Sequence, residues 1–126
     1  MTSAGVCGLH IASRQLDKKD APPKEPLEKG MQRIVETFTV TASVGEGWKY
    51  SNLYGLSRVG RLAGVNEFAT KDRKIAWYRE GAEHLIQMQM PDGSWRSNNL
   101  VDGNPVIATS FALLFLSSAP AQAKGK

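Results

Sequence analysis

The chain has 126 residues, of which 41% are hydrophobic, and this size and composition fit one folded domain with a modest core. The formal net charge is +4 and the sequence pI is about 9.4, but basic and acidic residues are interleaved along the chain, which argues against a nucleic-acid-binding protein. The longest apolar run, residues 106–116, is shorter than the ~20 residues of a membrane span, and no signal peptide is recognisable, so the localisation is unknown, with the cytoplasm as the default.

Helical spacing of the apolar residues predicts five helices, and no segment is convincing as a strand. In chain order the helices are expected at residues 2–16, 27–41, 51–63, 75–90 and 106–118. The first, third and fifth each begin near a Ser or Thr, which can cap a helix, and carry small residues that allow helices to pack closely. The alternating segment TFTVTASV, residues 37–44, leaves a strand as the alternative at the end of the second helix.

Two polar segments are expected to lie outside the helices. Residues 17–26, DKKDAPPKEP, contain three prolines and six charged residues, and they should form an exposed connector. Residues 120–126 are small, polar and basic, and they should form a flexible tail. Residues 1–119 are then left as one structural module.

The segment GAEHLIQMQMPDGSW predicts the end of an amphipathic helix followed by a tight turn and a buried tryptophan. Pro91 cannot continue the helix, because it lacks the N–H group and clashes with the preceding turn. The Asp-Gly pair that follows is typical of a turn. Gln89 lies just before the turn and Trp95 just after it, so the amide should reach the helix end and the indole.

An earlier part of the chain repeats some of this pattern, as expected for a repeat protein. Gly30 follows a basic residue and opens the earlier copy, as Gly81 opens the later one. The two glycines are 51 residues apart, and Trp48, which closes the earlier copy, lies 47 residues before Trp95. A period near 50 residues corresponds to one helical hairpin per repeat.

Five residues of the later copy have the spacing of the QW motif: Gly81, Leu85, Gln89, Gly93 and Trp95. The segment therefore resembles the terpenoid cyclase and protein prenyltransferase superfamily. Two positions depart from the motif, since Glu80 stands where a basic residue is usual and His84 where an aromatic is usual. In that superfamily the motif clamps the ends of outer helices in an α/α toroid, so the resemblance concerns the fold rather than catalysis.

The resemblance implies an all-α fold, specifically a partial α/α toroid. The chain is long enough for about two and a half helical hairpins, so it should form an open arc rather than a closed ring. Residues 1–119 would be the repeat module, resembling the C-terminal part of a larger toroid. An open arc leaves apolar surface uncovered on its first and last helices, and the last expected helix is apolar nearly all round.

The resemblance also implies which catalytic groups to look for, and this chain lacks them. The clustered carboxylates of the DxDD acid in squalene and hopene cyclases, and the DDxxD metal motif of ionising terpene synthases, are both missing. Cys7 and His10 share a helix face, but they do not reproduce the zinc ligands of protein prenyltransferases. His84 should be a structural histidine that pairs with Glu80. We expect no catalytic residue, cofactor or metal, although enzyme activity remains open.

A pocket is the remaining candidate for a site. Tyr50, Tyr54 and Arg58 recur at steps of four, so they share a helix face, and Asn52 lies near them at the start of an expected inner helix. Together they would line a pocket for a glycan or an isoprenoid group. Packing and solvation of a helix start are the alternative explanation.

The first functional hypothesis is a non-catalytic repeat module, similar to squalene cyclase and prenyltransferase repeats, that serves binding or assembly. Its partner would be a second copy of the chain or further repeats of a longer chain. The alternative is the C-terminal part of a larger toroid enzyme, a terpenoid cyclase or a polysaccharide lyase, with its catalytic residues upstream. A third hypothesis is a lipid or isoprenoid carrier.

Overall fold

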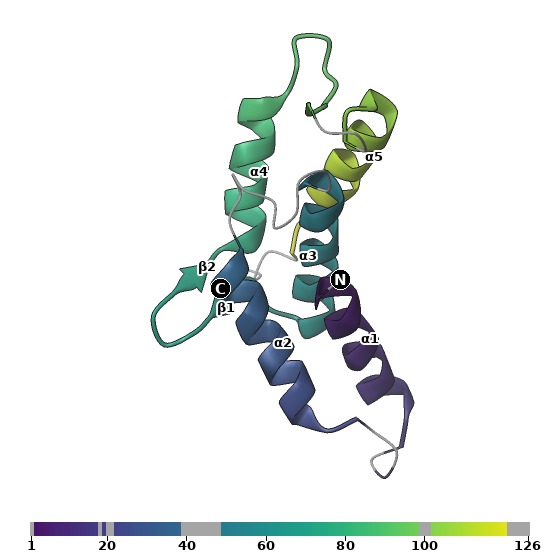
Figure 1. The fold of residues 1–126 in the computed structure, drawn as a ribbon, viewed down its shortest axis with the longest axis vertical. Coiled ribbons are helices and arrows are strands. Elements are labelled where there is room, and N and C mark those ends of the chain that lie inside the picture. Colours follow the sequence, from purple (N-terminus) through teal and green to yellow (C-terminus); the bar gives the residue numbers. More distant parts are fainter. Residues whose placement is uncertain (1, 18, 20–21, 39–48, 99–101, 121–126) are drawn as a thin grey trace, which may run out of the picture.

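The structure is a computed structural model, and it describes residues 2–17, 19, 22–38, 49–98 and 102–120. The described residues are mostly helical, which confirms the expected all-α class (Figure 1). Their helices are α1 (Thr2–Gln15), α2 (Lys24–Thr37), α3 (Lys49–Ala63), α4 (Trp77–Met88) and α5 (Pro105–Leu116). Between α3 and α4, the two-residue strands β1 (Phe68–Ala69) and β2 (Lys74–Ile75) pair antiparallel.

The short hairpin corrects the expectation that the chain contains no strand. Ile75, expected to begin the fourth helix, lies instead opposite Phe68 in the β1–β2 pair, and α4 begins at Trp77. The side chains of Phe68 and Ile75 are both buried. Apolar residues therefore continue without interruption from strand to helix, and their spacing alone could not locate the boundary.

The bounds of α2 also differ from the expected range. The helix begins at Lys24, inside the charged connector, and Pro26 lies in its first turn, where a missing N–H costs no helical hydrogen bond. It ends at Thr37, because Phe38 adopts an extended backbone with φ −69° and ψ 121°. Most of the segment with the alternative strand pattern, residues 39–44, lies outside the described residues, as does Trp48.

The helices form two rows. Figure 1 shows α1, α3 and α5 in one row, running in the same direction, with α2 and α4 beside them running the opposite way. Helix α3 is central, because it packs against α1, α4 and α5. Helix α2 packs against α1 and β1, and α4 also contacts α5.

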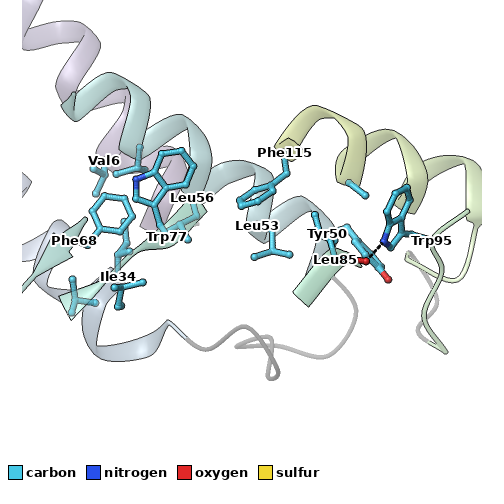
Figure 2. Close-up of a cluster of buried hydrophobic side chains, with 14 of the residues drawn as sticks. Val6, Ile34, Tyr50, Leu53, Leu56, Phe68, Trp77, Leu85, Trp95 and Phe115 are labelled. Atoms are coloured by element: carbon cyan, nitrogen blue, oxygen red, sulfur yellow. Dashed lines mark hydrogen bonds between the residues drawn. The ribbon is translucent and has the colours of Figure 1, made fainter. Parts of the chain in front are cut away.

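A single cluster of buried side chains connects the two rows. Figure 2 shows it extending from Phe68 and Trp77 at one end to Leu85 and Trp95 at the other. Trp77 is fully buried, and its indole N–H donates to the carbonyl oxygen of Val65 at 2.9 Å. Its ring centroid lies 6.3 Å from that of Phe68, so the first residue of α4 anchors both the hairpin and the helix row.

Two glycines allow the helices to approach closely. Gly60 of α3 lies against the indole of Trp77, and Gly81 of α4 lies against the ring of Phe115 on α5. A Cβ atom at either position would overlap atoms of these rings. Glycine inside a helix costs ~1 kcal/mol relative to alanine, and the close packing of an aromatic ring offsets that cost.

Candidate functional site

The turn after α4 is built by its own side chains. Gly93 has φ +85°, a conformation that glycine adopts without the strain of a side chain. The Asp92 carboxylate accepts hydrogen bonds from the backbone N–H of Ser94 at 3.0 Å and from its hydroxyl at 2.7 Å. The Gln89 amide donates to the Gly93 carbonyl at 2.9 Å, so it braces the turn from the end of the helix.

Trp95 joins α4 to α5. Its side chain is 4% exposed, as the sequence led us to expect, and its indole N–H donates to the Leu85 carbonyl at 2.7 Å (Figure 2). Its backbone N–H donates to the Thr109 hydroxyl oxygen on α5 at 3.0 Å. Leu85 and Gly81, the residues of the pattern that lie within α4, are both buried.

The earlier copy of the pattern is only partly described. Gly30 lies on α2 where that helix meets α1, and a Cβ atom there would come within 2.5 Å of a γ-methyl group of Val6. Trp48, the residue expected to close this copy, is outside the described residues. A second tryptophan clamp therefore stays a prediction.

Of the four residues expected to line a pocket, all on α3, two line a groove that the structure describes. Tyr50 is a core residue whose hydroxyl donates to the Arg96 carbonyl at 3.3 Å. Asn52 is exposed. Tyr54 and Arg58 do line a common groove, where the Arg58 guanidinium donates to the Tyr54 hydroxyl oxygen at 3.4 Å.

This groove lies between α3 and the end of α5 and has a volume of about 400 Å³. Its lining consists of Tyr54, Ser57, Arg58, Arg61, Leu62, Leu114, Ser117 and Ser118. The parallel helices α3 and α5 both end here, and cations at helix C-termini are stabilised by the helix dipole. Arg14 also donates to the Leu62 carbonyl in the last turn of α3. Of the two arginines that line the groove, Arg61 lies in the last turn of α3, where the dipole stabilises its charge, and Arg58 is held by the Tyr54 hydroxyl.

A larger groove of about 880 Å³ lies between α1, α2 and the β1–β2 hairpin. Leu27, Met31, Val35 and Phe68 give it an apolar lining. Arg73 holds the hairpin against α2, because its guanidinium donates to the Val35 carbonyl at 3.2 Å. Sequence analysis missed this groove, since residues 64–74 were assigned no structure and the β1–β2 hairpin forms one wall.

His10 lies in the wall of this larger groove. Its Nε2 atom is buried and has no hydrogen-bond partner among the described residues. Burial lowers the pKa of His10, and the nearby charge of Arg14 lowers it further. The imidazole is therefore neutral near pH 7, with one unsatisfied nitrogen.

A third polar cluster surrounds the start of α3. The buried carboxylate of Asp102 accepts a hydrogen bond from the Tyr50 backbone N–H at 3.2 Å, where the positive end of the helix dipole stabilises an anion. Burial lowers the pKa of Lys49, an effect that the charge of Asp102 opposes. Burial also raises the pKa of the Tyr50 phenol, and Asp102 adds to this rise. The cluster therefore stabilises a helix start, and the raised pKa keeps the Tyr50 phenol protonated near pH 7.

The pKa of His84 is lowered by burial and, to a smaller extent, by the charge of Lys49. The two histidines bind protons more readily in the unfolded chain than in the folded chain. The free energy of unfolding should therefore be highest above pH 6.5 and should decrease as the pH falls below that value. Urea denaturation at about pH 7.5 and 5.5 measures the decline. The double variant His10→Asn with His84→Asn should show a smaller decrease over this pH range. An unchanged decrease would show that the two histidines do not cause it.

Cys7 and His10 do not act together. The Cys7 thiol lies beside the Arg58 guanidinium, whereas His10 lines the larger groove. Burial raises the pKa of the thiol and Arg58 only partly opposes this, so Cys7 stays protonated and is a poor nucleophile. Within the described ranges, no three His, Cys, Asp or Glu side chains are grouped closely enough to bind a metal ion.

Two further findings bear on function. Among the described helices, none combines the length and the apolar character needed to cross a bilayer. Comparisons with models of protein families, with curated proteins and with solved structures found no match to this chain. The grooves and the exposed helix faces are therefore the guides to function.

Proposed function

We propose that this chain is a non-catalytic helical repeat module of the α/α-toroid type, related to the repeats of squalene cyclases and prenyltransferases, and that it serves assembly. The parallel row of α1, α3 and α5, with α2 and α4 running antiparallel beside it, supports this proposal. The buried Trp95 at the end of α4 supports it as well. Among the described helices α5 is the outer member of the row, and its exposed face is available to a partner.

The exposed face of α5 is the observation that carries the proposal. Val106 is 71% exposed and Leu113 is 54% exposed, and Ile107 and Leu114 beside them are exposed as well. The helix contains no charged residue. Exposed apolar surface of this kind, grouped on one helix face, marks a site of association.

A second copy of the chain is the occupant that fits this face. Two aliphatic pairs, at residues 106–107 and 113–114, lie seven residues apart, with Ser110 between them and Ser117 after them. When two such helices cross, the aliphatic pair of one copy can pack over the small serine of the other. A face without charge is complementary to itself, and a two-fold dimer uses the same surface on both copies.

The oligomeric state tests this proposal. The chain should be a dimer at about 100 µM by size exclusion with light scattering, because burying the aliphatic pairs of both copies favours association. The double variant Val106→Glu with Leu113→Glu should be a folded monomer, since four carboxylates would meet in the interface. Circular dichroism checks the fold.

Ile86→Glu is the matched control. Ile86 lies on α4 and is 69% exposed, so the variant introduces the same charge at a comparable aliphatic residue away from α5. It should leave the dimer intact. A monomeric parent chain at this concentration, or equal dissociation by the α4 and α5 variants, would overturn assembly through α5.

A further inference from the structure

The groove between α3 and the end of α5 carries positive charge that no carboxylate balances. Among the described residues that line it, the charged ones are Arg58 and Arg61, and both are exposed, so a ligand can reach them. The ion pairs found in the described part of the chain lie within α2 and within α4, so neither groove arginine takes part in one. A hollow lined by charge of one sign attracts small ions of the opposite sign.

The excess of positive charge extends beyond the groove. Helices α1, α3 and α5, which form one row, contain Arg14, Lys49, Arg58 and Arg61 but no aspartate or glutamate. Arg14 donates to the Leu62 carbonyl, and Leu62 lines the groove, so a third guanidinium lies at the rim. The acidic side chains of the five helices are all on α2 and α4. One end of the row therefore gathers three positive charges.

The C-terminal ends of α3 and α5 oppose an anion here, but their effect is smaller. Each helix C-terminus is equivalent to roughly half a negative charge, so the two ends together approach one. Some of their carbonyls already accept hydrogen bonds: the Gly64 N–H donates to Arg61 at 3.2 Å, and the Ser117 N–H donates to Leu113 at 2.9 Å. The three arginines outweigh this partial charge, and the groove stays positive.

The donors in the groove suit a phosphate group better than a carboxylate. Arg58 and Arg61 are three positions apart on α3, so they lie on one helix face, and each presents a fork of N–H donors that matches an oxyanion. The Tyr54 hydroxyl accepts from Arg58 at 3.4 Å, which leaves the phenol proton able to donate to an anion. Three donor groups exceed the two oxygens of a carboxylate, whereas a phosphomonoester offers three terminal oxygens and about two negative charges near pH 7.

The rest of the groove suits a small organic body. Its volume, about 400 Å³, lies within the range of roughly 300–1,000 Å³ typical of ligand pockets. Tyr54, Leu62 and Leu114 provide apolar contacts. The exposed Ser117 hydroxyl donates to the Leu114 carbonyl at 2.9 Å, so its oxygen can still accept a hydrogen bond from a ligand.

We propose that the groove between α3 and α5 binds a small phosphomonoester. Arg58, Arg61 and the Tyr54 hydroxyl bind the phosphate oxygens, and the organic body packs against Leu62 and Leu114. This site goes beyond assembly through α5, because its charged groups belong to α3. Leu114 is common to both surfaces, but affinity tests the groove and oligomeric state tests assembly, so either proposal can fail while the other holds.

Two matched probes test the recognition of the phosphate. Phenyl phosphate and phenyl sulfate share a phenyl ring and three terminal oxygens, but at about pH 7.5 the phosphate carries nearly two negative charges and the sulfate one. In low salt, isothermal titration calorimetry should show saturable binding of phenyl phosphate with a Kd below about 1 mM, at least fivefold tighter than that of phenyl sulfate. Inorganic phosphate should bind more weakly than phenyl phosphate, because it lacks the apolar body.

Arginine variants test the groove itself. Arg58→Gln and Arg61→Gln should each weaken the binding of phenyl phosphate about tenfold, since each removes a charge-assisted hydrogen bond, and the double variant should not bind it measurably. Circular dichroism checks that the variants are folded. The matched control is Arg33→Gln, which removes the same charge from an exposed arginine on α2 and should keep the affinity of the parent chain.

Heteronuclear NMR should place the shift changes at Leu62 and Ser117. A Kd for phenyl phosphate above about 1 mM, or equal affinity for phenyl phosphate and phenyl sulfate, would overturn the proposal. Inorganic phosphate binding as tightly as phenyl phosphate would remove the role of the organic body and overturn it as well. So would an equal loss of affinity in Arg33→Gln and Arg61→Gln, because binding would then depend on net charge alone.

Discussion

Replacing Trp95 with alanine should lower the free energy of unfolding by about 3–5 kcal/mol. The indole is 4% exposed, so its removal leaves a cavity between the end of α4 and the start of α5. The change also deprives the Leu85 carbonyl of the indole N–H that lies 2.7 Å away. Urea denaturation followed by circular dichroism measures the loss.

Trp95→Phe separates the two contributions. Phenylalanine keeps an apolar ring in the site but has no N–H, so the Leu85 carbonyl loses its partner while most of the packing remains. The expected loss is about 1–3 kcal/mol, which is smaller than that of Trp95→Ala. If Trp95→Ala cost less than about 1 kcal/mol, the indole would not belong to the core.

Replacing Gly81 with alanine should also destabilise the protein, by about 1–3 kcal/mol or more, although alanine is the better helix former. The new Cβ atom would overlap the Phe115 ring. That ring cannot move aside freely, because it stacks on Tyr78 with centroids 5.6 Å apart and meets the edge of Trp77 at 6.1 Å. Denaturation of the purified variant gives the magnitude.

Gly8→Ala on α1 is the matched control. Apart from its chain neighbours and the backbone of its own helix, nothing lies within 4 Å of the Cβ that this change adds, so the gain in helix propensity, up to ~1 kcal/mol, should appear as stabilisation. Adding Phe115→Leu to Gly81→Ala should recover part of the loss, because the smaller side chain makes room for the methyl group. A Gly81→Ala protein as stable as Gly8→Ala would show that the close contact is not formed.

The sequence was most informative where structure is local. The spacing of Leu85 and its neighbours predicted α4, and the Pro-Asp-Gly turn with a buried Trp95 followed from the chemistry of adjacent residues. The last helix of the expected open arc was predicted to leave apolar surface uncovered. The structure buries Ala108, Ala112 and Phe115 against the other helices and leaves the opposite face exposed.

The parts that could not be predicted depend on distant residues. The Asp102 carboxylate accepts a hydrogen bond from the backbone N–H of Tyr50, which lies 52 positions earlier in the chain. No local sequence pattern links an aspartate in a loop to the start of a distant helix. His10 and Phe68 are 58 positions apart and line one groove, because the β1–β2 hairpin lies beside α1 and α2. Tyr50 and Tyr54 lie four residues apart on α3, but Tyr50 is buried in the core and Tyr54 lines a groove.

The central position of α3 has a consequence for the way the protein opens. Leu53, Leu56 and Val59 of α3 are all buried, and the helix packs against three others, so it cannot detach without dismantling the contacts of α1, α4 and α5. Helix α2 rests only on α1 and the first strand among its principal contacts, and it can separate at smaller cost. Local opening of α2 therefore need not disturb the cooperative unit built around α3.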